Sequence, residues 1–464
     1  MNRIIIIGNG FDRAHNLRTG YKEFIDDYWN EFTSKITDII GKKFGISTMI
    51  EPYSDGYASL EVANLRIMSS TENYFLIEDP YTKQKYIKHP LLSNESNAYN
   101  NLIKFINEYN ASFPTQQLVL RFTNKFFEHI SEQCSLKNWL DIENEYYEEL
   151  KRILSDEDTK RRNARVRELN KGLKAVEKLL EEYLTKVTEN NNIEKHQSIQ
   201  DAFSSPVELD DIATCKQREF VDSIFSYMNR FENIMEFEED KNKDPEYMLC
   251  ITIDEERMHF IKKNIDKDFF KKTYCMPNTL LLNFNYTKTA ESLYIKEGMN
   301  FDIINIHGEL KSDNNPIIFG YGDELDEDYQ KIEKTQNNDF LENIKSIKYH
   351  QTRNYRDLLK FIESGIYQLF VMGHSCGNSD RTLLNTLFEH KNCASIKVFY
   401  WQPEADKDDY SNLIRNISRN FNDKPKMRDI VVNREYCSPL VPFNEKAVLE
   451  NQNNQIVSEL IRIQ

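Results

Sequence analysis

Glycine is scarce in this chain. Only 14 of the 464 residues are glycine, and Gly172 is the single one between positions 57 and 297. Because glycine is the commonest turn former, a long interval almost without it favours helices, and we predict a mainly helical region from about residue 100 to 270. Seven glycines instead lie at the ends of short apolar runs nearer the two termini: Gly8, Gly10, Gly308, Gly320, Gly322, Gly373 and Gly377.

Paired cysteines and long hydrophobic runs are also absent. The seven cysteines stand singly, which excludes a zinc ribbon and a thioredoxin-type Cys-x-x-Cys site and fits the reduced thiols of a cytoplasm. No apolar run approaches the roughly 20 residues that a membrane span requires. The run from Ile4 to Ile7 is too short for a signal peptide. We therefore expect a cytoplasmic protein without a membrane partner.

Positive charge is in deficit, with 60 Lys and Arg against 75 Asp and Glu and a formal net charge of −15. Neutralising a phosphate backbone needs a basic face. The net charge therefore argues against nucleic acid as a partner, although it does not exclude a local basic groove.

Short β-branched or aromatic runs near both ends of the chain predict the strands of an α/β sheet. The first, residues 3–8, has the continuous apolar character of a buried parallel strand. Five more follow the helical region, at 279–287, 301–308, 316–322, 368–375 and 395–401. Helical patterns such as 381–390 separate them, which indicates a mostly parallel, Rossmann-like α/β sheet.

This order predicts one α/β domain that a long helical insertion interrupts. Residues 1–50 supply its first strand and helix, and residues 276–464 supply the remainder. Between them we expect an irregular insertion over 51–98, containing a β-hairpin at 73–89, and a helical insertion domain over 99–275.

Helical periodicity is clear at two places. Thr19 is suited to cap a helix whose apolar face carries Tyr21, Phe24, Ile25, Tyr28 and Trp29. Within 160–187, apolar residues recur in steps of three and four over three heptads. That pattern fits a helical hairpin or short coiled coil, through which two copies of the chain would associate, or one long helix packed on its own domain.

Polar residues accompany the glycines at four predicted strand ends. In an open α/β sheet, ligands bind outside the carboxyl ends of the strands, where glycine lets a phosphate or ribose approach the backbone. Asp12 suits a hydrogen bond to a ribose, or it caps the next helical turn. Asn283 and Asn285 lie on one face, either aimed into a pocket or forming an Asx-type turn. His307, which titrates near neutral pH, is the best candidate for chemistry.

The segment GHSCG, 373–377, matches the nucleophile elbow of α/β-hydrolases. The hydrolase triad needs a later histidine, and the only one after Ser375 is His390, at the far end of the next predicted helix. Because that imidazole cannot turn back onto the serine, we favour a nucleotide-binding loop in which Ser375 bonds phosphate or ribose. Ser379 or Asp380 then caps the following helix, whose N-terminus favours an anion.

Two acidic segments allow a metal-binding interpretation. The run GDELDED, 322–328, carries five carboxylates that suit a divalent ion, although such runs are usually solvated loops. Asp141 and Glu143 follow a tryptophan and either act together on an irregular backbone or begin a helix.

The opening segment, IIIIGNGFDRAHNLRTGYKEFI, resembles the start of the AbiH family of phage abortive-infection proteins, which carries G-N-G-F-D-x-A-H and then T-x-Y-x-x-F. Later landmarks of that family are also resembled, in the same order, by four further segments: the tryptophan–acid segment at 139–143, FNYT, IHG and GHS…SD. The resemblance spans nearly the whole chain. It implies a function in defence against phage, with a phage-derived component as the trigger.

The order of the strand-end motifs is also similar, more distantly, to that of sirtuin-like NAD-binding proteins, some of which destroy NAD in defence. This similarity implies hydrolysis of NAD, or a related nucleotide, at the nicotinamide–ribose bond, with Asn285 and His307 acting on the ribose. The zinc ribbon of deacylating sirtuins has no counterpart, and no cofactor or metal is implied. From the strand-end patterns we expect the nucleotide to contact Gly8, Asn9, Gly10, Phe11, Asp12, Asn283, Tyr286, Gly373, His374, Ser375 and Asp380.

Three hypotheses follow from these patterns. The first is an NAD-cleaving defence enzyme. The second is a sensor that binds NAD or ADP-ribose without turnover and signals through the helical insertion. The third, least favoured by the charge balance, is a metal-dependent nuclease toxin acting through the acidic segments.

Overall fold

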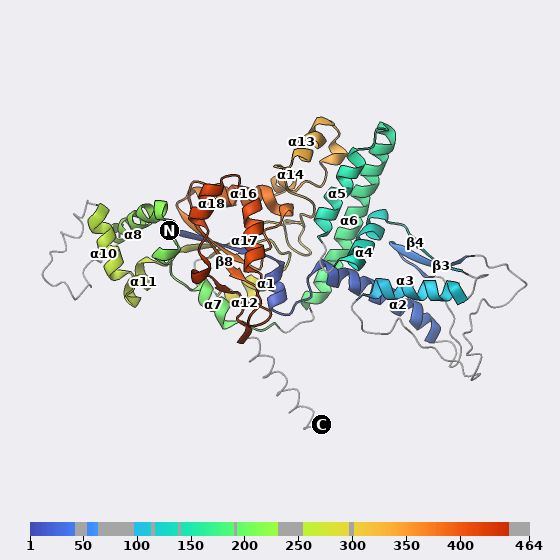
Figure 1. Ribbon diagram of the computed structural model, residues 1–464, viewed down its shortest axis with the longest axis horizontal. Helices are drawn as coiled ribbons and strands as arrows, with labels where there is room; N and C mark the ends of the chain where they lie inside the picture. Colours follow the sequence, from blue (N-terminus) through green and yellow to red (C-terminus); the bar gives the residue numbers. More distant parts are fainter. Residues whose placement is uncertain are drawn as a thin grey trace, which may run out of the picture. The chain divides into compact units, whose positions relative to one another are not determined.

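The computed structural model describes residues 1–41, 53–63, 97–112, 117–137, 141–189, 193–230, 254–296 and 301–444. The chain divides into two compact units (Figure 1). Unit 1 comprises Met1–Leu17, Val187–Lys334 and Asn343–Gln464, and unit 2 comprises Arg18–Lys186 and Thr335–Glu342. This division places the first long helix in unit 2 and residues 187–275 in unit 1, whereas the sequence assigned that helix to the sheet domain and residues 187–275 to the insertion.

Unit 1 is built on a six-stranded sheet in which every pairing is parallel, in the order β6-β5-β1-β7-β8-β9. The strands are β1 Asn2–Ile7, β5 Asn278–Asn283, β6 Phe301–Asn305, β7 Tyr367–Met372, β8 Cys393–Tyr400 and β9 Ser438–Pro439. This is the strand order of a Rossmann sheet, and it reverses between β1 and β7. The predicted α/β fold, with a helical insertion between its strands, is confirmed.

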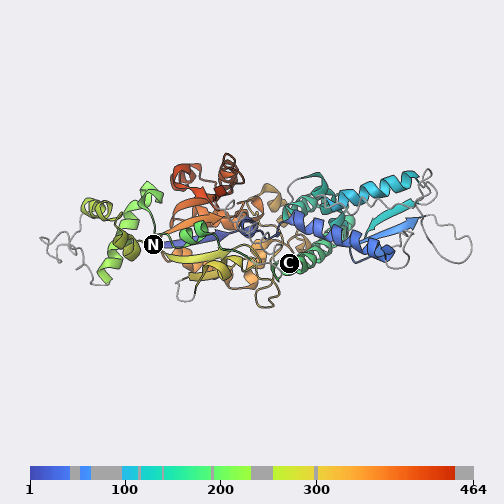
Figure 2. The same cartoon turned by 90° about the horizontal axis from the view of Figure 1, so that it is seen from below.

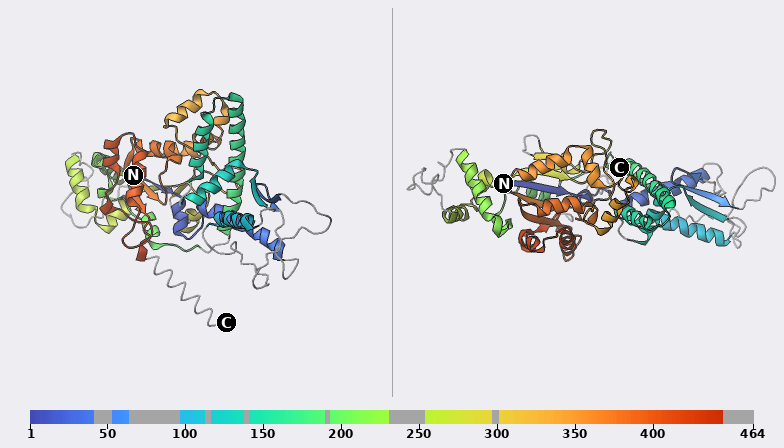
Figure 3. Two further views of the ribbon diagram at one scale, coloured as in Figure 1. Left: turned by 45° about the vertical axis from the view of Figure 1, so that its right-hand side comes forward. Right: turned by 90° about the horizontal axis from the view of Figure 1, so that it is seen from above.

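The isoleucines of β1 explain why this strand lies at the centre of the sheet. Ile4 and Ile6 pack with α15, α16 and α17 on one face, and Ile5 and Ile7 pack with α1, α7 and α12 on the other. All four are buried, and each contributes about 1.5–3 kcal/mol. Helices cover both faces of the sheet (Figures 2 and 3). They are α1 Asn9–Ala14, α7 Gln197–Phe203, α12 Thr289–Tyr294, α15 Asn354–Glu363, α16 Arg381–Glu389 and α17 Tyr410–Arg419.

Of the remaining helices of unit 1, α8, α10 and α11 pack at the amino ends of the strands, and α18 packs against β8. Met1, Ile366 and Ala394, at the amino ends of three strands, share a third apolar cluster with α8, α10 and α11. The bounds are α8 Gln217–Arg230, α10 Asp254–Asn264, α11 Asp268–Tyr274, α13 Glu327–Lys334, α14 Lys345–Lys348 and α18 Lys424–Ile430.

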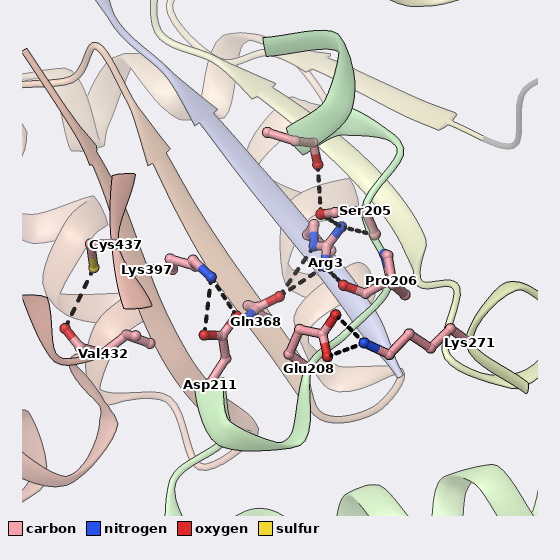
Figure 4. Close-up of polar contacts among 11 residues, drawn as sticks. Arg3, Ser205, Pro206, Glu208, Asp211, Lys271, Gln368, Lys397, Val432 and Cys437 are labelled. Carbon is pink, nitrogen blue, oxygen red and sulfur yellow. Dashed lines mark hydrogen bonds and ion pairs between the residues drawn. The ribbon is translucent and has the colours of Figure 1, made fainter. Parts of the chain in front are cut away.

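A buried polar network ties the segment 205–211 to the sheet (Figure 4). The fully buried guanidinium of Arg3 donates to the carbonyl oxygens of Ser205 and Pro206, at 2.6 and 3.0 Å, and to Oε1 of Gln368 on β7. The Gln368 amide in turn donates to Asp211, which also pairs with Lys397 of β8 at 3.0 Å. Buried polar groups need such partners, and these join three strands to one connection.

Unit 2 combines helices with a small antiparallel sheet ordered β2-β3-β4. Its core surrounds Trp29 of α2, which packs against Phe127 and Tyr99 and donates its indole N–H to Ser131. The elements are α2 Tyr21–Gly41, β2 Tyr53–Ser54, β3 Ala58–Ala63, α3 Ala98–Ser112, β4 Gln117–Phe122, α4 Lys125–Leu136, α5 Ile142–Leu154 and α6 Thr159–Glu189.

Several local predictions need correction. Residues 316–322 are not a sheet strand: Pro316 lacks an N–H, and the amides of Ile318 and Tyr321 donate to His307 and Asn343 instead of a neighbouring strand. Strand β4 interrupts the region expected to be helical. Helix α2 begins at Tyr21, so Gly20 rather than Thr19 precedes it.

The heptads of 160–187 belong to one long helix, α6, as the second interpretation held. The hairpin predicted at 73–89 lies outside the described residues. Within the described parts of the chain, no helix has the length and apolar character needed to cross a bilayer.

Candidate active site

The loops that follow β1 and β7 touch at the point where the strand order reverses. The amide of Gly10 donates to the carbonyl oxygen of Gly373 at 2.7 Å. A Cβ added to Gly8 would lie 2.5 Å from Cα of His374, and one added to Gly373, where φ is +70°, would lie 2.0 Å from the amide nitrogen of Phe11. Glycine is therefore required here for the two loops to approach each other.

Four side chains from separate parts of the chain converge beside these loops. Asp380 accepts a hydrogen bond from Nζ of Lys345 at 2.7 Å through Oδ1, and the same oxygen lies 3.3 Å from Nε2 of His307. Its other oxygen, Oδ2, lies 3.5 Å from Nε2 of His374. The predicted residues His307, His374 and Asp380 thus share one cluster, which also contains a lysine that the sequence did not single out.

The backbone of unit 1 explains how these side chains meet. His307 follows β6 and His374 follows β7, at the same edge of the sheet, and Asp380 directly precedes α16. Lys345 opens α14, where its amide donates to the carbonyl oxygen of Tyr321. Asp380 was expected to cap α16, but its side chain makes no cap hydrogen bond because Lys345 and the two histidines occupy it.

Burial shapes the protonation of the cluster. Lys345 is 1 % exposed, and His307, His374 and Asp380 are each 7 % or less exposed. Burial opposes ionisation of Asp380, but Lys345 and His307 outweigh it and hold the pKa of that carboxyl well below its usual value. Burial, assisted by the charge of Lys345, lowers the pKa of His307 despite the opposing effect of Asp380. At neutral pH the cluster therefore contains an ionised Asp380 and a neutral His307, which is able to accept a proton.

Aromatic rings flank the two histidines. The Phe284 ring packs edge-on against both imidazoles, with centroid separations of 5.0 Å to His307 and 4.4 Å to His374. The Tyr349 ring lies nearly parallel to His307, and its hydroxyl oxygen is 3.2 Å from Nε2. These contacts fix the ring planes and exclude water, which strengthens the electrostatic interactions inside the cluster.

Asn283, the last residue of β5, and Asn285, just beyond it, make different contacts. Asn283 accepts from the amide of Asn285 and donates to Asn305 and to the backbone of Thr287, so it forms the Asx-type turn that the sequence left open. The Asn285 side chain instead donates to the carbonyl oxygen of Gly8 at 3.0 Å. Asn285 therefore bridges the β5 loop to the first glycine turn.

Asp12 is a second buried carboxyl at this edge of the sheet. It lies inside α1, so it does not cap the next helical turn, and Thr287 donates to its Oδ2 at 2.6 Å. Its Oδ1 is buried without a hydrogen-bond partner among the described residues. Burial raises the pKa of Asp12 to about 6, although the hydrogen bond from Thr287 and the nearby polar side chains of Thr289 and Asn285 oppose the shift. Asp12 therefore titrates close to neutral pH.

Other predicted contact residues lie apart from the cluster. Phe11 is fully buried in the apolar core and packs edge-on against Tyr294. The Tyr286 hydroxyl donates to the carbonyl oxygen of Ile318, and Asn9 is exposed at the start of α1. Ser375 is exposed as well.

The hydrolase interpretation of GHSCG lacks a base beside the serine. His390 lies 3.1 Å from Glu363, and Nδ1 of His374 accepts from the amide of Cys376. Both imidazoles are therefore engaged elsewhere.

The acidic segments have structural partners. Asp323, at the start of the acidic run, pairs with Arg381 at 3.2 Å. Asp141 caps α5 by accepting from two amides, which supports the helix-start interpretation. Among the residues that the structure describes, no group of three or more His, Cys, Asp or Glu side chains is arranged to hold a metal ion.

Sequence reasoning missed Lys345 and Tyr349. They lie in the segment KSIKY, which has neither a glycine nor a strand end to mark it. Nothing in one sequence distinguishes Lys345 from the exposed lysines around it. The backbone pairing of residues 321 and 343–345 that buries it is a tertiary feature.

A family model of bacteriophage abortive infection AbiH proteins matches residues 4–401. Because this match covers most of the chain, the chain belongs to the AbiH family of abortive-infection proteins that act against phage, and the predicted family is confirmed. No curated protein and no solved structure matches the chain. The more distant similarity to sirtuin-like proteins stays a prediction.

Proposed function

We propose that this AbiH protein hydrolyses NAD, or a related nucleotide, at the bond between nicotinamide and ribose. One observation carries the proposal: His307, His374 and Asp380 come together beside the Gly8–Gly10 turn, at the reversal of a Rossmann-ordered sheet. That reversal is where open α/β sheets bind nucleotides.

The side chains at this edge suit the chemistry. Glycosidic cleavage passes through an oxocarbenium-like transition state, which positioned groups and charge complementarity stabilise. Neutral His307 polarises or deprotonates a ribose hydroxyl. Asn285, held against Gly8, orients the ribose and the attacking water.

The burial of the cluster favours a restrained resting state. His307, His374, Asp380 and Lys345 are closed off by one another and by Phe284 and Tyr349. A nucleotide reaches them only after the surrounding loops separate. In an abortive-infection protein, such opening would follow a phage-derived trigger.

The same burial also favours the second hypothesis, a sensor that binds NAD or ADP-ribose without turnover. Measuring NAD and nicotinamide in phage-infected cells that express the protein separates the two, because infection supplies the trigger. An enzyme depletes NAD and releases nicotinamide during infection, and a sensor leaves both unchanged.

The variants His307→Ala and Asn285→Ala test which residues carry the reaction. Each is expected to keep the fold and to abolish nicotinamide release, whereas Lys391→Ala, which removes an exposed lysine paired with Glu363, is expected to retain it. Release at the wild-type rate in both site variants would refute the proposal. Degradation of RNA or DNA that depends on added metal would instead support the nuclease hypothesis.

A further inference from the structure

The hydrogen bonds around the two histidines specify where their protons lie. Nδ1 of His374 accepts from the amide of Cys376 at 3.0 Å, so this nitrogen carries no proton. In the neutral ring the proton is therefore on Nε2, which faces Oδ2 of Asp380. The Nε2–H of His374 therefore lies 3.5 Å from the carboxylate.

His307 meets the other oxygen of the same carboxylate. An ionised carboxylate only accepts hydrogen bonds, and Oδ1 of Asp380 lies 3.3 Å from Nε2 of His307. The negative charge on that oxygen disfavours a lone pair on Nε2, so the neutral ring of His307 keeps its proton there and donates it to the Tyr349 hydroxyl, 3.2 Å away. The lone pair is then on Nδ1, which has no hydrogen-bond partner among the described residues.

We propose that Asp380 and Lys345 are positioning residues that hold His307 as the Nε2–H tautomer, so that Nδ1 is the base at this site. Asp380 orients the ring and stabilises the imidazolium that forms, and Lys345 keeps Asp380 ionised through its 2.7 Å contact. Neither residue needs to touch the substrate. The role of Nδ1 as the base rests on the proposed function, whereas the tautomer of His307 does not depend on it.

Every proton and electron pair of the proposed cleavage has a destination. Nδ1 takes a ribose hydroxyl proton while the C1′–N bond breaks and its electron pair passes to the nicotinamide nitrogen. Water then bonds to C1′, one of its protons restores the hydroxyl, and the proton held by His307 passes to solvent. The imidazolium exists only between these steps, while it faces the Asp380 carboxylate.

The charges facing His307 act on it in opposite directions. Asp380 favours the imidazolium and Lys345 opposes it, while His374 and the Tyr349 hydroxyl are the other groups that face the ring. Removing Lys345 should therefore raise the pKa of His307, and removing the Asp380 charge should lower it, each by about 1 or more. A purely structural role for the pair predicts no such opposed shifts.

Nuclear magnetic resonance of the full chain with ¹⁵N-labelled histidine tests the tautomer directly. The His307 signals are assigned by their loss in His307→Gln. The expected result at pH 7.5 is a proton on Nε2 and an unprotonated Nδ1, and a proton on Nδ1 would overturn the inference. This measurement needs no activity, so its failure is distinct from failure of the proposed function.

Variants then test the two positioning residues. Lys345→Met should raise the pKa of His307 and Asp380→Asn should lower it, while Lys348→Met, which removes a lysine bonded to the Phe319 carbonyl oxygen instead, should leave it unchanged. If either single variant fails to fold, Lys345→Met/Asp380→Asn, which removes both charges, replaces it. In that double variant a mixture of tautomers is expected, and retention of the pure Nε2–H form would contradict the role of Asp380.

Kinetics supply the last criterion. In extracts of phage-infected cells, which contain the trigger, Asp380→Asn should lower kcat for NAD at least about 100-fold with little change in KM, because Asp380 acts through His307. A change confined to KM would show instead that Asp380 contacts the substrate and would reject the positioning role. If the tautomer is as expected but wild-type protein releases no nicotinamide in infected cells, the proposed reaction fails while the positioning arrangement stands.

Discussion

Nζ of Lys345 lies 2.7 Å from Oδ1 of Asp380, and the side chains of both residues are almost completely buried. Two charges in such surroundings stabilise the fold only as a pair, because each alone carries a large desolvation cost. The pair joins α14 to the residue that precedes α16, and it lies at the centre of the candidate site. Site chemistry and fold stability are therefore linked at this position.

Lys345→Met should destabilise unit 1 by about 3–5 kcal/mol, because it leaves the Asp380 carboxylate buried without its cation. Urea unfolding followed by far-ultraviolet circular dichroism measures the loss. Lys360→Met removes an exposed partner of Asp357 and should cost less than about 1 kcal/mol. Lys345→Met/Asp380→Asn should recover much of the loss. A single variant as stable as the control would contradict a buried ion pair.

Gly373→Ala should destabilise the protein by about 2–4 kcal/mol, because φ is +70° and the new methyl group would meet the backbone of Phe11. Gly365→Ala is the matched control, since a Cβ there meets nothing within 4 Å. The control should lie within about 0.5 kcal/mol of wild type. Thermal unfolding of both variants measures the difference, and equal midpoints would show that the two loops are not in contact in solution.

The Asp12 carboxyl predicts a dependence of stability on pH. Its pKa is raised from 3.8 to about 6 in the folded protein, so the folded state binds the proton more tightly than the unfolded state. Protonated Asp12 therefore contributes about 2–3 kcal/mol to the free energy of unfolding. This contribution is fully present below about pH 4 and is lost as pH rises through 6.

Asp12→Asn removes this titration and keeps an acceptor for Thr287. The unfolding free energy of wild type should accordingly fall relative to that of the variant as pH rises from 5 to 7.5. Urea titrations at several pH values measure it. A difference that stays constant over this range would show that Asp12 remains ionised at pH 5.

The parallel sheet was predictable because its strands carry local signals. β1, β5, β7 and β8 are short, apolar and β-branched or aromatic, and glycine or asparagine follows several of them. The segment 316–322 has the same composition but pairs with no sheet strand, because its backbone bonds to residues 307 and 343. Composition therefore identified segments able to form strands, and tertiary pairing decided which of them did so.

The candidate site was predictable where it coincides with strand ends or, at Asp380, with the start of a helix. His307 and His374 lie two residues beyond the ends of β6 and β7, and chain topology brings such positions to one edge. Lys345 opens the short helix α14, whose place beside Tyr321 no local pattern encodes. Phe11 stands in a predicted binding motif but points into the core, because α1 turns its apolar face toward Tyr294.

Arg3 lies at the opposite end of β1 from Gly8. Substituting it tests whether the stability of unit 1 can be lowered without changing the candidate site. Arg3→Leu should destabilise unit 1 by about 3–5 kcal/mol, because Gln368 and the carbonyl oxygens of Ser205 and Pro206 lose a buried donor. Arg353→Leu, at an exposed arginine near Asp357, should cost less than about 1 kcal/mol.

Urea unfolding measures both arginine variants, and the ¹⁵N signals of His307 report on the site in the molecules that remain folded. Those signals should be unchanged in Arg3→Leu, because Arg3 lies at the amino end of the sheet and the histidine cluster at the carboxyl end. A stability loss together with an altered His307 tautomer would show that the network in Figure 4 also sets the geometry of the site.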